Sequence, residues 1–229
     1  MSKLLIDGDI VAYRAAYSAE GKTIEDAEDK VDEVMDFIFE NTIFGISESL
    51  YEVFLTGKGN FRHGYDKEYK ANRKDKAKPE FLDASRDYLV ECYQATIING
   101  QEADDAIAIR ATELGPDAVI ASIDKDFMQV PCKHYNFGRG EWYTVTPEEG
   151  LLFFYKQVLT GDRQDNVIGL KGIGPVKAGK IMEGAETEQE MFRRCVEAYD
   201  GDLERVIRNA RMLWLRREED QIWQPPEAD

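Results

Sequence analysis

Residues 118–126 read AVIASIDKD, an apolar run that leads directly into Asp124 and Asp126. A short apolar run of this kind is typical of a buried strand. The same pattern opens the chain, where LLI at 4–6 leads into Asp7. Further strand-like runs are YEVFL at 51–55, ATII at 95–98 and WYTV at 142–145.

Helical patterns separate these strands. Residues 24–44 carry an amphipathic stripe, and 80–93 and 101–114 have similar patterns; the stripe consists of Ile24, Ala27, Val31, Val34, Ile38 and Phe39. Strands that alternate with helices predict an α/β fold with a mostly parallel sheet covered on both faces. From about residue 147 we expect helices only, at 147–159, 175–183, 187–199 and 202–217. This predicts a domain built around the sheet at 1–150 and a helical region at 151–229.

Composition excludes several classes of protein. The 229 residues include 29 basic and 45 acidic side chains, a net charge of −16. Asp7 interrupts the first apolar run, so a secretory signal is not expected, and no run reaches the roughly 18 apolar residues of a membrane span. Three scattered cysteines without a CxxC pair indicate a reducing compartment and no zinc knuckle. We therefore expect a cytoplasmic protein.

Acidic residues form four groups along the chain: Asp7; Glu102, Asp104 and Asp105; Asp124 and Asp126; Asp162 and Asp165. Taken singly, each is compatible with a helix cap or a helix first turn. Taken together, they lie at strand ends and facing helix starts, which this fold class brings to one edge. Oxygen ligands with almost no histidine favour Mg²⁺ or Mn²⁺, and two such ions about 4 Å apart would support phosphodiester hydrolysis.

Two short basic segments interrupt the acidic background. Residues 58–78 hold eight Lys and Arg against three acids, with Phe61, Tyr65 and Tyr69 spaced to share one helical face. Arg62, Lys70 and Arg73 lie beside these aromatic residues. Interleaved aromatic and basic side chains suit single-stranded nucleic acid. The alternative is an ordinary solvated loop.

The second basic segment, 171–180, lies inside LKGIGPVKAGKIM at 170–182, which fits a helix-hairpin-helix pattern at about 168–183. Gly172 and Gly174 allow the backbone to approach a phosphate, and Pro175 suits the first turn of the next helix. Lys171, Lys177 and Lys180 add positive charge. The alternative is a glycine-rich turn without a ligand.

Five stretches together resemble the 5′→3′ exonuclease and flap endonuclease family, which includes the nuclease domain of bacterial DNA polymerase I and small phage-encoded exonucleases. They are LLIDGDIVAYRAAY, FRHGYDKEYKANRK, GQEADDAIA, ASIDKDFMQV and LTGDRQDNVIGLKGIGPVKAGKI, in family order between residues 4 and 182. The chain is most similar to the short phage type. The resemblance implies a PIN-like domain with a helical arch at about 58–80 and a helix-three-turn-helix, and a C-terminal helix that packs back on the nuclease domain.

The resemblance also implies roles for individual residues. Glu102 and Asp104, with Asp7 nearby, would hold one Mg²⁺. Asp124, Asp126 and Asp165, with Asp162 nearby, would hold the other, and Asp105 belongs to the same acidic set. Lys70 and Arg73 would contact the phosphates around the scissile bond, next to Tyr69 in the YKxNR motif. The hairpin would hold duplex DNA and a potassium ion.

One position departs from the family. Many relatives have an aspartate where this chain has Thr56, at the end of the second strand. A threonine supplies no carboxylate, so a weaker first metal site is expected. Asp9 could compensate for the missing carboxylate, or it could cap a helix; the sequence leaves both alternatives open.

These features predict a structure-selective DNA nuclease that uses two Mg²⁺ ions, or Mn²⁺ in their place. It would act on 5′ ends and 5′ flaps in replication, primer removal or end processing, and on RNA in RNA–DNA hybrids. We expect a monomer without membrane contact. Two alternatives are a non-catalytic DNA junction-binding protein and a PIN-type ribonuclease, the latter leaving the hairpin and the YKxNR motif unexplained.

Overall fold

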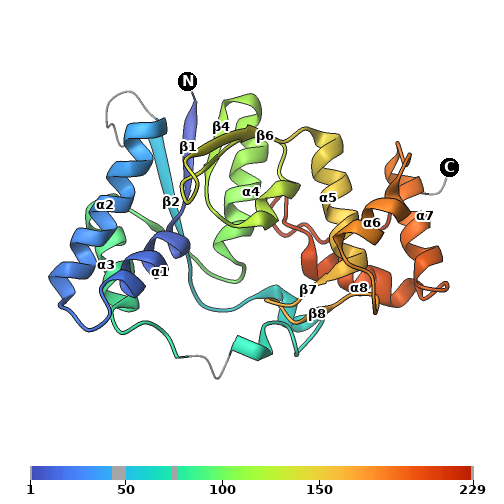
Figure 1. Ribbon diagram of the computed structural model, residues 1–229, viewed down its shortest axis with the longest axis horizontal. Helices are drawn as coiled ribbons and strands as arrows, with labels where there is room; N and C mark the ends of the chain where they lie inside the picture. Colours follow the sequence, from blue (N-terminus) through green and yellow to red (C-terminus); the bar gives the residue numbers. More distant parts are fainter. Residues whose placement is uncertain (1, 43–49, 74–76, 228–229) are drawn as a thin grey trace.

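The computed structural model describes residues 2–42, 50–73 and 77–227, and a six-stranded sheet lies at its centre (Figure 1). The strand order is β3-β2-β1-β4-β5-β6. Five strands run parallel, and only β6 pairs antiparallel to its neighbour. This confirms the mostly parallel sheet. The strands are β1 (Lys3–Asp7), β2 (Tyr51–Thr56), β3 (Thr96–Ile98), β4 (Ala118–Ala121), β5 (Lys133–Asn136) and β6 (Glu141–Thr144).

Helices cover both faces of the sheet, as expected. On one face, α1 (Gly8–Ser18), α2 (Ile24–Thr42) and α3 (Leu82–Tyr93) enclose a core with β1 and β2. On the other face, α4 (Ala103–Leu114) packs on β1, β2 and β4. The amphipathic stripe of 24–44 is confirmed in part as far as Thr42, because Ala27, Val31, Ile38 and Phe39 are buried in α2 whereas Ile24 is exposed. Its last two residues lie outside the described ranges.

Two elements of the sheet layer are absent from the sequence prediction. Helix α1 follows β1 without a loop, because Asp7 both ends the strand and caps the helix. Gly8 is required there, since a Cβ atom would lie 2.7 Å from the Phe54 carbonyl oxygen. Strand β5 reads KHYN, and its polar composition hides a strand whose His134 and Tyr135 are buried.

The C-terminal part is mostly helical, with α5 (Pro147–Thr160), α6 (Pro175–Met182), α7 (Glu188–Ala198) and α8 (Leu203–Leu213) around one buried cluster. The expectation of helices only was wrong at the short hairpin of β7 (Gly161–Asp162) and β8 (Val167–Ile168). The predicted helix 202–217 ends at Leu213, and the chain continues as an irregular segment over 214–223, with bends and a turn at 217–220, here called the strap. The domain division near residue 150 stays a prediction.

The segment predicted as a helical arch, 58–80, has a different local structure. Among its described residues, 58–73 and 77–80, the helical parts are two short 3-10 turns, η2 (Phe61–Gly64) and η3 (Ala71–Arg73). The shared helical face of Phe61, Tyr65 and Tyr69 was therefore wrong. Gly64 and the tertiary contacts of the neighbouring side chains explain the short turns. Within the described ranges, no helix is both long and apolar enough to cross a membrane.

Candidate metal centre

An acidic cleft of about 910 Å³ opens at the carboxyl ends of β1 and β4. Six of the eight predicted metal ligands line it: Asp7, Glu102, Asp104, Asp124, Asp126 and Asp165. They come from the end of β1, the start of α4, the turn after β4 and the β7–β8 turn. The structure thus brings together, at one sheet edge, acids that lie up to 158 residues apart in the sequence numbering, from Asp7 to Asp165.

A short chain of hydrogen bonds orders the acids at the strand ends. The Ser122 hydroxyl donates to Asp7 Oδ2 at 2.7 Å and accepts from the Asp124 N–H at 3.0 Å. Asp124 Oδ1 then accepts from the Asp126 N–H at 2.8 Å, so Asp124 caps the short helix Lys125–Gln129, as one of the alternatives left open by the sequence allowed. Ser122 was not predicted as a site residue; its position two residues before Asp124 was the available signal.

Asp7 and Asp104 lack cationic partners close enough to form an ion pair within the described part of the chain. Burial, reinforced by Asp9 and Asp124, raises the pKa of Asp7 to about 7. Burial together with the charges of Asp7 and Asp124 raises the pKa of Asp104 well above its usual range. Carboxylates that repel one another in a buried site favour a bound cation.

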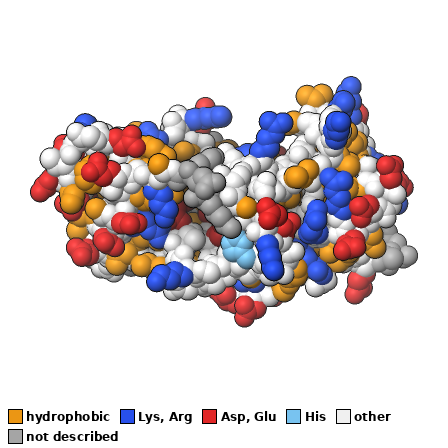
Figure 2. Space-filling view, turned by 90° about the horizontal axis from the view of Figure 1, so that it is seen from below, with side chains coloured by type: hydrophobic (Ala, Val, Ile, Leu, Met, Phe, Trp, Pro, Cys, Tyr) orange, Lys and Arg blue, Asp and Glu red, His pale blue; other side chains and the backbone are white. Residues whose placement is uncertain are grey.

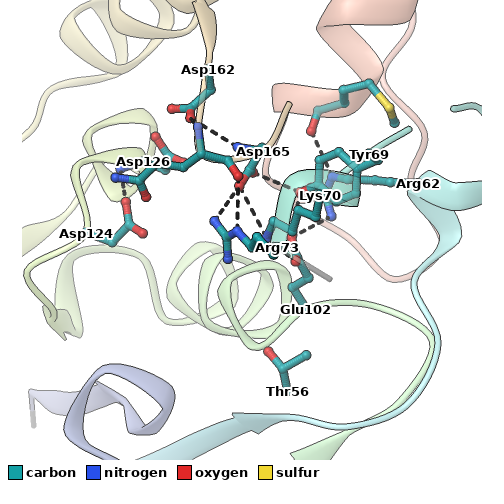
Figure 3. Close-up of polar contacts among 12 residues, drawn as sticks. Thr56, Arg62, Tyr69, Lys70, Arg73, Glu102, Asp124, Asp126, Asp162 and Asp165 are labelled. Carbon is teal, nitrogen blue, oxygen red and sulfur yellow. Dashed lines mark hydrogen bonds and ion pairs between the residues drawn. The ribbon is translucent and has the colours of Figure 1, made fainter. Parts of the chain in front are cut away.

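Two cations of the 58–73 segment, Lys70 and Arg73, also line the cleft (Figure 3). Lys70 Nζ pairs with Glu102 Oε1, and Arg73 Nη2 lies 2.7 Å from Asp165 Oδ1. The Tyr69 hydroxyl lies 2.9 Å from both Glu102 Oε2 and Asp165 Oδ2. Burial raises the pKa of Glu102, but Lys70 and Arg62 outweigh burial and hold that pKa below its usual value. Burial raises the pKa of Asp165, with Lys70 opposing it.

Asp105 does not line the cleft, although it was predicted as a metal ligand. It is fully buried and receives the Arg62 guanidinium through two hydrogen bonds, at 2.6 and 2.8 Å. The Glu102 and Arg216 N–H groups complete its shell at 3.3 and 3.2 Å. With both oxygens bonded, this carboxylate serves as an anchor between α4, the 58–73 segment and the strap.

Arg62, predicted to contact DNA, is buried for the same reason. Its guanidinium also donates to the carbonyl oxygens of Met212 at 2.9 Å and Trp214 at 2.7 Å. Phe61 is covered by Arg216, whose Cζ lies 3.6 Å from the ring centroid, and Tyr69 is buried. Only Tyr65 remains exposed among the four predicted contacts of this segment. Tertiary contacts of this kind have no signature in the local sequence.

Asp162 also lies outside the cleft lining. Its Oδ1 accepts from the Gln164 N–H at 2.7 Å and its Oδ2 pairs with Lys125 Nζ. Lys125 and the backbone donors hold the pKa of Asp162 below its usual value, although burial opposes them. The alternative of a helix cap or first turn, which the sequence left open for each acid, does not hold for Asp162, because this residue belongs to β7. Its carboxylate fixes the turn that presents Asp165.

The second predicted DNA contact, at 168–183, forms an exposed turn followed by α6. Gly172 has a positive φ of 79° and Pro175 begins the helix, as predicted. Strand β8 and a turn, rather than a helix, immediately precede the hairpin. Lys171, Lys177 and Lys180 are exposed. On the face seen in Figure 2, Lys and Arg side chains lie over the C-terminal helical part of the molecule. Arg205 donates to the Gly169 carbonyl at 2.9 Å, and the potassium ion stays a prediction.

The cleft offers the carboxylate oxygens that a divalent cation prefers, although these carboxylates do not converge on one point. In the described part of the chain, no three acidic, histidine or cysteine side chains stand close enough together to hold a metal ion. The donor set is nevertheless carboxylate oxygen alone, and Asp7, Asp104 and Asp124 repel one another. Carboxylate oxygens of this kind suit Mg²⁺ or Mn²⁺.

Comparison with known proteins identifies the family of the chain. Residues 2–150 match the family model described as the 5′-3′ exonuclease, N-terminal resolvase-like domain. DNA polymerase I of Rhizobium leguminosarum is 33% identical over 181 residues, which cover 69% of this chain and 17% of the polymerase. Flap endonuclease Xni of Shewanella piezotolerans is 32% identical over 140 residues, 54% of each chain. This chain spans about a sixth of the Rhizobium relative, so the whole polymerase's activities do not transfer to it.

Solved structures show the same fold. The flap endonuclease of bacteriophage T5, in a complex with DNA and metal ions, superposes with a TM-score of 0.71 at 16% identity, covering 93% of this chain and 89% of the T5 chain. That similarity supports the predicted α/β fold, and the T5 protein is one that binds divalent metal ions. The sequence match over 2–150 and the identity to the Rhizobium polymerase carry the assignment. This chain belongs to the 5′→3′ exonuclease and flap endonuclease family.

Proposed function

We propose that this protein is a metal-dependent nuclease that hydrolyses DNA phosphodiester bonds at 5′ ends and 5′ flaps. RNA in RNA–DNA hybrids would be a further substrate, and the roles would be primer removal or end processing in replication. The observation that carries the proposal is the unneutralised pair of Asp7 and Asp104 in a cleft whose opposite wall is cationic. An acidic wall suits cations, and a cationic wall suits the phosphates that accompany them.

The cleft residues would have two roles, metal binding and phosphate binding. Asp7, Glu102, Asp104, Asp124, Asp126 and Asp165 would hold two Mg²⁺ or Mn²⁺ ions. When bound, these ions would activate a water and stabilise the leaving oxygen. Lys70 and Arg73 would exchange their carboxylate partners for phosphate oxygens and stabilise the charge that develops there.

The hairpin at 168–183, which lies outside the cleft, would bind the DNA backbone. Its exposed lysines and the free N–H groups at the start of α6 suit backbone phosphates and carry no sequence preference. The remaining surface is strongly acidic, with a net charge of −16 for the chain. Binding should therefore weaken steeply with salt. We propose that the protein acts on DNA as a monomer.

The direct test uses an end-labelled 5′-flap DNA and a blunt duplex with Mg²⁺, Mn²⁺, Ca²⁺ or EDTA. Cleavage of the flap with Mg²⁺ or Mn²⁺ alone is expected, and Asp124→Asn should abolish it while DNA binding persists. Asp87→Asn, an exposed acid of α3 outside the cleft lining, is the matched control and should cleave normally. Cleavage by Asp124→Asn at the wild-type rate would remove Asp124 from the metal site.

A second candidate function is DNA binding without cleavage. It is favoured by the ion pairs of Lys70 with Glu102 and of Arg73 with Asp165, which occupy two proposed metal ligands. Tight binding of the flap DNA without cleavage in any metal would support this candidate and contradict the nuclease.

A further inference from the structure

Thr56 ends β2 beside the acidic cleft, at the position where the family resemblance leads one to expect an aspartate. Its hydroxyl does not point into open solvent. Thr56 Oγ1 accepts a hydrogen bond from the Ala103 N–H at 2.9 Å, although the two residues lie 47 positions apart. Ala103 is the first residue of α4, so this bond joins the end of a sheet strand to the start of the helix that carries Glu102 and Asp104.

The first N–H groups of a helix have no partner within the helix and must be satisfied from outside. In α4, the Glu102 N–H donates to Asp105 Oδ2 at 3.3 Å, and the Ala103 N–H donates to Thr56. These contacts leave Asp104 unbonded within the described chain and Glu102 bonded to Lys70 and Tyr69. Asp104 therefore faces the cleft, and Glu102, although it is the N-cap of α4 and shares a capping box with Asp105, also reaches Lys70 and Tyr69 at the cleft.

Thr56 is itself fixed by two neighbouring side chains. Its N–H donates to Asp9 Oδ2 at 2.9 Å, and its carbonyl oxygen accepts from Arg86 Nη2. Arg86 Nη1 also pairs with Asp9 Oδ1. Both carboxylate oxygens of Asp9 thus have partners, and the helix cap of α1 is Asp7. The cap alternative for Asp9 is therefore wrong, because Asp7 caps α1, whereas Asp9 does line the cleft and its role in replacing the missing carboxylate stays a prediction.

We propose that Thr56 is a positioning residue for metal binding, which holds the first turn of α4 so that Glu102 and Asp104 face the cleft. Asp9 and Arg86 support it by fixing the backbone of Thr56. The inference rests on the proposed function only in requiring that the cleft binds divalent ions. A threonine at this position thus has a role of its own, and it is not merely a lost ligand.

The test measures Mn²⁺ affinity by calorimetry, without substrate, for the wild type, Thr56→Val and Thr56→Ser. Valine keeps the shape of threonine but removes the acceptor, whereas serine keeps the hydroxyl. We expect Thr56→Val to bind Mn²⁺ about tenfold or more weakly, in the range typical of lost outer-shell contacts, and Thr56→Ser to remain within about twofold of the wild type. Thr56→Asp retains an acceptor and should bind at least as tightly as the wild type.

The matched control is Thr112→Val on the same helix, whose hydroxyl donates to the Ala108 carbonyl at 2.8 Å and lies outside the cleft lining. It should leave Mn²⁺ affinity unchanged, even if the helix loses stability. If Thr56→Val does not fold, Arg86→Gln frees the backbone of Thr56 from one side and should weaken Mn²⁺ binding more than Thr112→Val does.

The outcomes are distinguishable. A wild-type protein that binds no Mn²⁺ contradicts the proposed function itself. A wild type that binds Mn²⁺, together with a folded Thr56→Val of equal affinity, contradicts only the positioning role. Equal weakening in Thr56→Val and Thr112→Val would also contradict it, because general loss of helix stability would then explain the change.

Discussion

Two neighbouring residues of α4, Asp104 and Asp105, have opposite environments. Asp104 faces the cleft with no ion pair, and burial among other acids raises its pKa well above the usual range. Asp105 faces inward, where Arg62 binds both of its oxygens. Consecutive helical residues point about 100° apart, so one aspartate faces a shared acidic edge and the next a buried arginine. The same side chain type is thus destabilising at one position and structural at the other.

The largest expected effect concerns Asp104→Asn. Removing a proposed metal ligand should lower flap cleavage by about 10³-fold or more, since a bound metal contributes several kcal/mol to the transition state. The metal-free protein should become more stable, because a buried charge repelled by Asp7 is gone. A cleavage assay beside thermal unfolding in EDTA checks both parts. A lower Tm together with normal cleavage would contradict the assignment of Asp104 as a metal ligand.

Arg62→Met should produce the opposite pattern. Breaking a buried ion pair leaves Asp105 without a cationic partner, at a cost of about 3–5 kcal/mol. For a chain of this size the Tm should fall by roughly 6–20 °C. Lys30→Met, which breaks the half-exposed pair with Glu33, is the matched control and should change the Tm little. A small change in Tm for Arg62→Met, equal to that of the control, would contradict the structural role of the Arg62–Asp105 pair.

Sequence reasoning predicted the fold class and placed six of the eight predicted acids in the cleft at one sheet edge, because strand ends and helix starts are local features. It could not separate Asp104 from Asp105, since the difference depends on Arg62, 43 positions away from Asp105. It placed Arg62 and Tyr69 on a DNA-facing helix for the same reason. The local sequence around a basic or aromatic residue is the same whether its side chain contacts a ligand or packs in the interior against Met212 and Trp214.

Lys70→Ala should have an intermediate effect. Lys70 pairs with Glu102, and its pKa is raised because the attraction of Glu102 and Asp165 outweighs burial. Losing this charge should slow the single-turnover cleavage rate by about 10²-fold, as for other groups that stabilise a developing anion. Lys125→Ala, which removes the partner of Asp162 and Asp126 but lies outside the cleft lining, is the comparison and should slow cleavage less. An unchanged single-turnover rate for Lys70→Ala would exclude it from the chemistry.

The smallest expected effect lies outside the cleft, at His134 of β5. Burial lowers the pKa of His134 to about 4, below the ordinary value of 6.5. Between these values the unfolded chain binds the proton and the folded chain does not, so stability falls as pH falls from about 6.5 toward 4. His134 should contribute a loss of about 2 kcal/mol between pH 7 and pH 5.

His134→Phe keeps a ring against Tyr143, which stacks on His134 at 4.9 Å, and removes the titration. Urea unfolding at several pH values should therefore show a flatter pH dependence for the variant than for the wild type. Contributions from the cleft acids cancel in this difference. Parallel pH curves for the two proteins would show that His134 is not buried in its neutral form.

The most direct test of the metal centre counts bound Mn²⁺ by electron paramagnetic resonance during titration, without DNA. The account predicts two ions for each wild-type chain and the loss of at least one in Asp104→Asn, with Asp87→Asn unchanged. A wild type that binds no Mn²⁺, or an Asp104→Asn variant that binds as many ions as the wild type, would contradict the assignment of the acidic cleft as the metal site.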